Sequence, residues 1–248
     1  IVFERGRSIE KRSVDVEKFW QTGELDEESN VQFGEGGAGT FSDGKLTTGI
    51  KDKRARKVIE ALAASGGGEE LLYKQKPHIG TDRLKEVVVA IRKRIIELGG
   101  IIFFESKLTD IIVENGALSA IVINNEKTVK TQNLILAIGH SARDTYRILL
   151  DKGMDMEQKP FSMGLRIEHP QSLINKAQYG DESGLGLGAA DYKLSYRSSN
   201  GRGVYTFCMC PGGRVIAASS EKGKLVTNGM SERARDSGLA NSGLLVDV

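Results

Sequence analysis

A glycine-rich segment, residues 30–49, constrains the fold of this chain more than any other feature. It reads NVQFGEGGAGTFSDGKLTTG and holds six glycines. Glycine loses much conformational freedom on folding and offers no side chain to pack, so the segment is ill suited to a helix or a strand. Such a run is typical of backbone that approaches a ligand closely or adopts positive φ angles. The whole chain has 30 glycines in 248 residues, well above the usual share of about 7%, which favours a fold with many tight turns over a helical bundle.

Composition excludes several classes of protein. The net charge is +2, from 35 basic and 33 acidic residues, and the charges are mixed along the chain, so nucleic-acid binding is not expected. The chain has no run of about 18 apolar residues, so no membrane-spanning helix is predicted. The two cysteines, Cys208 and Cys210, predict a reduced, cytoplasmic protein, and their spacing on a strand places them on the same face. The chain begins inside an apparent strand and without methionine, so we expect an internal piece of a longer protein, whose targeting signals are not visible here.

The first 153 residues predict an α/β domain. Apolar runs at 1–4, 101–104 and 133–139 (NLILAIG) predict buried strands, and helices are expected at 13–23, 54–68, 81–98 and 141–153. Asn115-Gly116 predicts a hairpin, with a third antiparallel strand at 127–131. The expected order is therefore strand, helix, strand, three-stranded meander, strand.

The pattern changes after residue 153. Residues 161–169, 192–199, 203–210 and 214–220 predict strands and residues 170–180 a helix, which together indicate an antiparallel sheet with some helix. The C-terminal residues, SGLLVDV, predict no obvious element. The chain is thus expected to form two domains, 1–153 and 154–248.

Two features of the first domain predict nucleotide binding. Glu4 ends a strand, where dinucleotide-binding folds place an acid that accepts hydrogen bonds from a ribose. Backbone N–H groups of Gly36, Gly37 and Gly39 could form a concavity for an anion, with Thr40, Ser42 and Lys45 adding hydroxyls and a positive charge. The segment is not a P-loop, because Leu46 stands where the magnesium-binding hydroxyl belongs. The alternatives are an exposed acid without a ligand and a flexible surface loop.

Further candidates follow later strands. Gly139 ends the strand NLILAIG, where backbone can lie against a ligand, and His140 follows it at the start of a helix. His140 and Cys210 are the only candidates for a catalytic role. Capping or packing is the more frequent role of such a histidine, and packing is favoured for the two cysteines because redox work needs an exposed thiolate of low pKa.

Taken together, VQFGEGGAGTFSDGKL, LILAIGHSARDTY, PFSMGLRIEHPQSLIN and FCMCPGGRVIAASSEKGKLVTNGMS resemble the uncharacterised FAD-dependent dehydrogenases of the glutathione-reductase-like flavoprotein class. The resemblance implies a FAD/NAD(P)-binding Rossmann-like domain with a β-meander and a second α+β domain with an antiparallel sheet, which covers the flavin and the substrate. It implies FAD as cofactor, with NAD(P)H as a candidate electron donor, and an unknown small-molecule substrate. The implied cofactor-binding residues are Glu4, Arg5, Gly36, Gly37, Gly39, Thr40, Phe41, Ser42, Gly44, Lys45, Leu108 and Gly139.

Two departures from that family matter. The glycine fingerprint expected before IVFERG and the later Gly-Asp segment that closes over the flavin are absent from this chain. We therefore expect it to hold only part of the FAD contacts. A non-catalytic nucleotide-binding or regulatory module remains the alternative to an oxidoreductase. A flavin enzyme acting on RNA is a third, which the balanced charge disfavours.

Overall fold

The computed structural model describes residues 1–46, 50–181 and 186–248 and divides the chain into two compact units. Unit 1 comprises residues 1–37, 94–158 and 219–224, and unit 2 comprises residues 38–93, 159–218 and 225–248. The glycine-rich segment is thus shared between the units. The predicted division into domains 1–153 and 154–248 stays a prediction.

Unit 1 begins with a short parallel pair of strands. β1 (Val2–Phe3) pairs with β2 (Ile102–Phe103), and the rings of Phe3 and Phe103 stack with centroids 5.5 Å apart. Helix α1 (Ile9–Thr22) follows β1 and ends at Gly23, whose φ of 76° and N–H bond to the Phe19 carbonyl form the left-handed cap that glycine favours. The strands are predicted as buried, but Val2 is 47% exposed. Within the described part of the chain β1 pairs with β2 alone, so the sheet here is too small to bury both strands.

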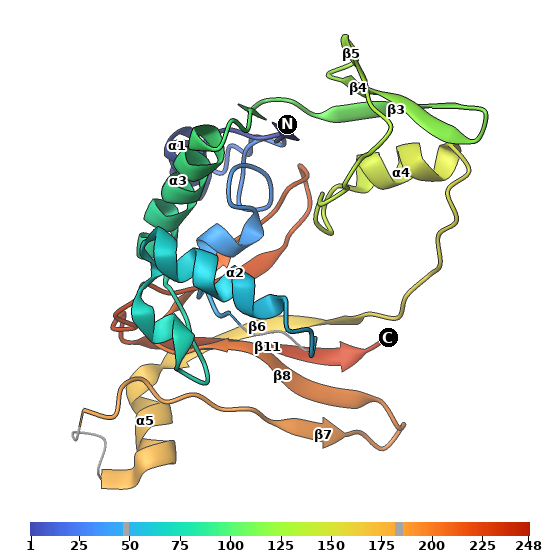
Figure 1. The fold of residues 1–248 in the computed structure, drawn as a ribbon. Coiled ribbons are helices and arrows are strands. Elements are labelled where there is room, and N and C mark those ends of the chain that lie inside the picture. Colours follow the sequence, from blue (N-terminus) through green and yellow to red (C-terminus); the bar gives the residue numbers. More distant parts are fainter. Residues whose placement is uncertain (47–49, 182–185) are drawn as a thin grey trace. The chain divides into compact units, whose positions relative to one another are not determined.

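The β-meander of unit 1 forms as predicted. β3 (Leu108–Glu114) and β4 (Ala117–Ile123) are joined at Asn115-Gly116, both with positive φ, and β5 (Lys127–Lys130) adds the third antiparallel strand. Helix α4 (Arg143–Asp151) packs on β3 (Figure 1). The core between them consists of Ile111, Ile121, Ile123 and Leu149.

The predicted strand NLILAIG is wrong. Residues 133–139 have no regular secondary structure and pair with no strand among the described residues. Leu134 and Leu136 pack on the core of unit 1, whereas Ile135 between them is 93% exposed. The apolar run therefore has one buried face, and a segment without a neighbouring strand forms no ladder.

Unit 2 contains the predicted antiparallel sheet. Its strand order is β6-β11-β8-β7, built from β6 (Ser162–Pro170), β7 (Ser195–Arg197), β8 (Gly203–Cys210) and β11 (Leu239–Asp247), as Figure 1 shows. β11 corrects the expectation that the C-terminal residues form no element, because it lies between β6 and β8 and pairs with both. A second sheet pairs β9 (Arg214–Ala217) with β10 (Thr227–Met230), and helix α5 (Gln171–Tyr179) follows β6.

The helical part of unit 2 lies earlier in the chain. Helix α2 (Ala55–Leu62) continues into the short helical turns η2 (Ala63–Gly67) and η3 (Glu69–Leu72), and a further turn, η1 (Ala38–Phe41), lies in the glycine-rich segment. Helix α3 (Thr81–Glu97) runs from unit 2 into unit 1 and ends before Gly99, as predicted. Leu71, Ile79, Leu84 and Val87 form the core here. The structure is therefore mixed α/β with antiparallel sheets, and the parallel Rossmann-like sheet implied by the resemblance is not confirmed.

Candidate functional site

Glu4 lies at the carboxyl end of β1 and binds the glycine-rich segment. Its Oε1 accepts hydrogen bonds from the backbone N–H groups of Gly6 (2.8 Å) and Gly34 (3.0 Å). The two glycines are so close that a Cβ on Gly6 would lie 2.6 Å from the Gly34 backbone. The predicted ribose-binding acid therefore joins β1 to the start of the loop, and both bonds use one of its two oxygens.

Arg5 is held by protein groups on every side. Its guanidinium bonds to Glu28 (2.7 Å), pairs with both oxygens of Asp144 (3.1 Å each) and lies 3.9 Å from the ring centroid of Phe33. Lys107 bonds to the same two carboxylates, at 2.9 and 2.6 Å. Burial raises the pKa of Asp144, but the hydrogen bonds from Lys107 and Arg5 outweigh it and lower that pKa to about 2. Glu28, Asp144 and Lys107 were not predicted, since neither their spacing nor their neighbours single them out.

These contacts bring three predicted segments together within unit 1. Leu108, directly after Lys107, is the first residue of β3 and packs against the core. Gly139 has a φ of 70° and lies five residues before Asp144, and its carbonyl accepts a bond from Tyr146 Oη (3.1 Å). The carboxyl end of β1, the start of β3 and the start of α4 therefore meet at one place.

A cavity of about 280 Å³ lies at this place. Its lining mixes cations, carboxylates and amides: Arg5, Gly6, Arg7, Asp26, Glu28, Ser29, Glu105, Lys107 and Asn124. It therefore borders the predicted ribose-binding end of β1 and the start of β3.

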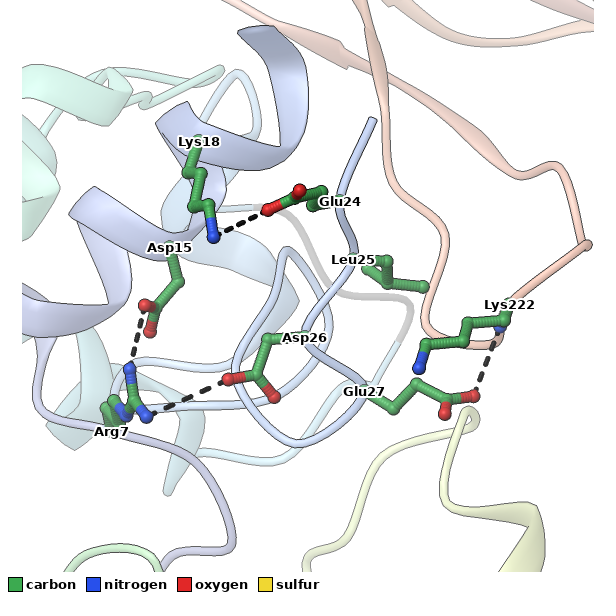
Figure 2. A pocket seen from close by; sticks show the side chains of 8 residues that line it. All are labelled: Arg7, Asp15, Lys18, Glu24, Leu25, Asp26, Glu27 and Lys222. Atoms are coloured by element: carbon green, nitrogen blue, oxygen red, sulfur yellow. Dashed lines mark hydrogen bonds and ion pairs between the residues drawn. The ribbon is translucent and has the colours of Figure 1, made fainter. Parts of the chain in front are cut away.

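A second cavity of unit 1, of about 490 Å³, is shown in Figure 2. Arg7 pairs there with Asp15 (2.9 Å) and Asp26 (3.9 Å), and Lys18 pairs with Glu24 (2.6 Å). Four carboxylates and three cations line it, so it does not select one sign of charge. None of the predicted cofactor-binding residues lines this cavity.

Arg12 is the main residue of unit 1 that sequence analysis missed. It is fully buried, and its guanidinium donates to five backbone carbonyls, those of Asn30 (2.8 Å), Val31 (2.9 Å), Gly34 (3.3 Å), Glu35 (2.6 Å) and Gly37 (3.0 Å). A signal was present, because Arg12 shares the buried face of α1 with Ile9 and Val16 at helical spacing. Burial lowers the pKa of Arg12 to about 10, against the opposing charges of Glu4 and Glu35, so the guanidinium is charged at neutral pH.

The glycines above Arg12 need their special backbone conformations. Gly34, Gly36 and Gly37 have φ angles of 120°, 84° and 63°, a region that other residues rarely adopt. At Gly34 a Cβ would also lie 2.3 Å from Arg12 Cδ. Gly39 differs, because its φ is not positive and no atom lies within 4 Å of a Cβ added there.

The second half of the segment belongs to unit 2 and is mostly buried. Thr40 and Phe41 lie in η1, both almost fully buried, and Thr40 Oγ1 has no hydrogen-bond partner in the described part of the chain. Ser42 Oγ bonds to the Gly39 carbonyl (2.6 Å) and accepts from the Gly44 N–H (3.1 Å). Gly44 has a φ of 66°, and a Cβ there would lie 2.9 Å from the Gly80 nitrogen.

Asp43 is the centre of a charged cluster in unit 2. Its carboxylate, 2% exposed, pairs with Arg235 (2.5 Å) and Lys45 (3.1 Å) and accepts a bond from Ser231. Burial raises the pKa of Asp43, but Lys45, Arg235 and Ser231 together outweigh it and lower that pKa. Lys45 also donates to the Met209 carbonyl, so its ammonium is bound by the protein.

The two cysteines and His140 differ in how far they are exposed to solvent. Cys210 is buried, 3.6 Å from Asp43 Oδ1, and burial raises the pKa of its thiol to about 12. Cys208 is exposed. The prediction that both point to one face is wrong, because Cys208 has a φ of 46° in a bulge opposite β11 that breaks the alternation of β8. His140 is exposed, and its Nε2 lies 3.3 Å from Ser141 Oγ.

The second part of the chain is similar to a known protein family. Residues 160–248 match the family model described as FAD-dependent protein, C-terminal domain-like. This match supports a FAD-dependent protein family for the second part of the chain. An uncharacterized protein of Clostridium beijerinckii (strain ATCC 51743 / NCIMB 8052) is 55% identical over 250 residues, which cover 100% of this chain and 47% of that relative. The chain thus spans about half the length of the curated relative it matches.

The described residues contain neither a membrane-spanning helix nor a cluster of metal ligands. No helix among them is both long enough and apolar enough to cross a membrane. The same residues contain no group of three or more histidine, cysteine, aspartate or glutamate side chains that could hold a metal ion.

Proposed function

We propose that this chain is part of a FAD-dependent oxidoreductase acting on an unidentified small molecule, and that unit 1 binds the adenosine end of the cofactor. The observation that carries the proposal is the position of Glu4. Glu4 directly follows β1, its Oε1 holds the glycine-rich loop, and its Oε2 would accept a hydrogen bond from a ribose hydroxyl. The family match of residues 160–248 supports FAD as the cofactor.

The residues of unit 1 fit such a cofactor. Glu4 would accept bonds from the ribose, Leu108 would present backbone to the adenine, and Gly36 and Gly37 supply exposed or half-exposed backbone with no side chain in the way. Arg5 is bound by Glu28 and Asp144, so its role would be to fix this end of β1. FAD supplies the electron transfer, whereas the protein binds and orients it.

The residues of unit 2 have separate proposed roles. Gly39, Thr40, Phe41, Ser42, Gly44 and Lys45 are proposed as further cofactor-binding residues on the strength of the resemblance alone. Lys45 is bound to Asp43 and to the Met209 carbonyl, which would hold its ammonium in one place. NAD(P)H as electron donor, a cytoplasmic location and His140 or Cys210 as catalytic groups stay predictions.

The first experiment is a titration of the purified chain with FAD, FMN and ADP, followed by flavin fluorescence for the flavins and calorimetry for ADP. Recognition of the adenosine end predicts binding of FAD and ADP and little binding of FMN, which lacks adenosine. Binding of FMN and FAD with equal affinity would contradict it. Bound flavin that neither NAD(P)H nor dithionite reduces would favour a non-catalytic nucleotide-binding module.

The matched variant is Glu4→Gln, which keeps an oxygen acceptor for Gly6 and Gly34 but removes the charge. We expect FAD and ADP to bind more weakly by about 1–3 kcal/mol, the usual contribution of a hydrogen bond to a charged group. Glu114→Gln, at the exposed end of β3, is the control and should bind as the wild type does. Unchanged affinity in Glu4→Gln would remove Glu4 from the site.

A further inference from the structure

The five carbonyls bound by Arg12 determine where the adjoining amide groups point. In a trans peptide the C=O and N–H bonds lie in one plane and point in opposite directions. The carbonyls of Glu35 and Gly37 point inward to the buried guanidinium. The N–H of Gly36, and that of the residue after Gly37, therefore point away from Arg12.

The outer side of this loop is open. Gly36 is exposed and Gly37 half-buried, directly above the fully buried Arg12. Within the described residues the Gly36 N–H has no partner, whereas the Glu35 N–H bonds to the Arg7 carbonyl (3.0 Å). Gly36 and Gly37 have positive φ angles, 84° and 63°, so the backbone turns sharply here. The Gly37 N–H bonds to the Gly34 carbonyl (3.0 Å), which leaves the Gly36 N–H as the donor on the outer side.

We propose that Arg12 is a positioning residue for a phosphate group of the bound dinucleotide. The guanidinium binds the negative ends of the peptide dipoles inside unit 1 and so turns the Gly36 N–H outward, whereas the Gly37 N–H bonds back to the Gly34 carbonyl (3.0 Å). The ligand is a phosphate or pyrophosphate group, and Arg12 does not touch it. This inference rests on the proposed nucleotide site but assigns a role to a residue that lies beneath that site.

The geometry explains why an arginine is required. Five N–H donors in a planar fork reach five carbonyls from one point, and a lysine ammonium offers three donors without that plane. Arg12→Lys keeps the positive charge but releases some of the carbonyls, so the peptides above it lose their fixed orientation. The loop would then still fold against α1, but its outward N–H would no longer be held in one orientation.

The test compares ADP with adenosine by calorimetry on the whole chain. The wild type should bind ADP at least tenfold more tightly than adenosine, and Arg12→Lys should lose at least tenfold in ADP affinity while its adenosine affinity changes less than twofold. Arg147→Lys, the same substitution on the exposed face of α4, should change neither. A purely structural role would weaken both ligands together, and that result would overturn the inference.

A second measurement needs no variant and holds even if Arg12→Lys fails to fold. The amide resonance of Gly36 should shift in the NMR spectrum of the wild type when ADP is added and stay in place when adenosine is added. An unmoved Gly36 resonance with bound ADP would overturn the phosphate site and leave the adenosine site intact. If the wild type binds neither ligand, the proposed function fails along with this inference.

Discussion

Two buried charges hold the two halves of the glycine-rich segment, and they are stabilised in opposite ways. Arg12 of unit 1 is a cation that donates to five neutral backbone carbonyls, and the charges of Glu4 and Glu35 raise its pKa against the effect of burial. Asp43 of unit 2 is an anion paired directly with two cations. The same loop is thus fixed by peptide dipoles on one side and by ion pairs on the other.

The difference determines which polar groups lose their partner when Arg12 or Asp43 is replaced. Carbonyl groups buried around Arg12 cannot move to water without unfolding the loop, so each would stay unpaired. The side chains of Arg235 and Lys45 are 20% and 30% exposed, and both can turn toward solvent when Asp43 is neutralised. Removing Arg12, which is held by buried carbonyls, should therefore cost more stability than removing the charge of Asp43, whose two partners are partly exposed.

The largest effect is expected for Arg12→Met, which removes all five donors and keeps a long apolar side chain. The free energy of unfolding should fall by about 3–5 kcal/mol, because several buried carbonyls lose their donor at a cost of about 1–3 kcal/mol each. Urea denaturation followed by circular dichroism measures it, with Arg147→Met as control. A loss below about 1 kcal/mol would mean that water replaces the guanidinium as the donor to the five carbonyls.

A smaller effect is expected for Asp43→Asn, about 1–3 kcal/mol, because the amide can keep the bond from Ser231 while the two cations reach solvent. Asp191→Asn, which breaks an exposed pair with Lys76, is the control and should cost less than about 1 kcal/mol. A loss in Asp43→Asn equal to that in Arg12→Met would refute the comparison between the two charges.

The pH dependence provides a second check on Asp43. Its pKa is lowered in the folded state, so its stabilising contribution is complete above the unfolded value of about 3.9 and is lost as the pH falls through the folded pKa. The difference in unfolding free energy between wild type and Asp43→Asn should therefore be constant above about pH 5 and shrink below pH 4. A difference that grows on acidification would have the wrong sign.

The third prediction concerns the loop apex that Arg12 supports. Gly37→Val places a β-branched side chain at a φ of 63° and should cost about 1–2 kcal/mol of stability through backbone strain. Gly39→Val is the matched control two residues away, because its φ is not positive and space for a Cβ is free. Thermal unfolding of the two variants side by side should show a loss in Gly37→Val alone, and equal losses would show that the apex is not strained.

Local signals explain what sequence analysis could foresee in the fold. The Asn115-Gly116 hairpin and the helix stop at Gly99 depend on backbone angles that two or three residues specify. The strand NLILAIG failed because a ladder also needs a partner, which hydrophobicity does not supply. β11 was missed for the converse reason. Asn241, Ser242 and Gly243 are residue types of low strand propensity, but they are buried in a strand that pairs on both sides.

The candidate site shows the same limit. The positions of Glu4 and the positive-φ glycines followed from the type of residue required there. The side chains that hold the site together bond to partners far away in the sequence. Arg12 lies 22 residues from Gly34, Asp144 lies 139 residues from Arg5, and Arg235 lies 192 residues from Asp43. A charged residue inside a helix or a loop usually faces water, so only its tertiary partners distinguish it.

The smallest effect on stability, and the last test of the comparison, concerns the two thiols of β8. Cys210 lies against Asp43, and burial together with that carboxylate raises its pKa to about 12, so the thiol adds no charge to the Asp43 cluster at neutral pH. Cys208, turned outward by the bulge, should react with a disulfide reagent within minutes under native conditions, whereas Cys210 should react only on unfolding. Cys208→Ser should abolish the fast phase and leave the unfolding free energy within about 0.5 kcal/mol of the wild type. Two fast-reacting thiols in the native protein would mean that Asp43 lies within reach of solvent, and its pairing with Arg235 and Lys45 would then be a surface interaction like that of Asp191 with Lys76.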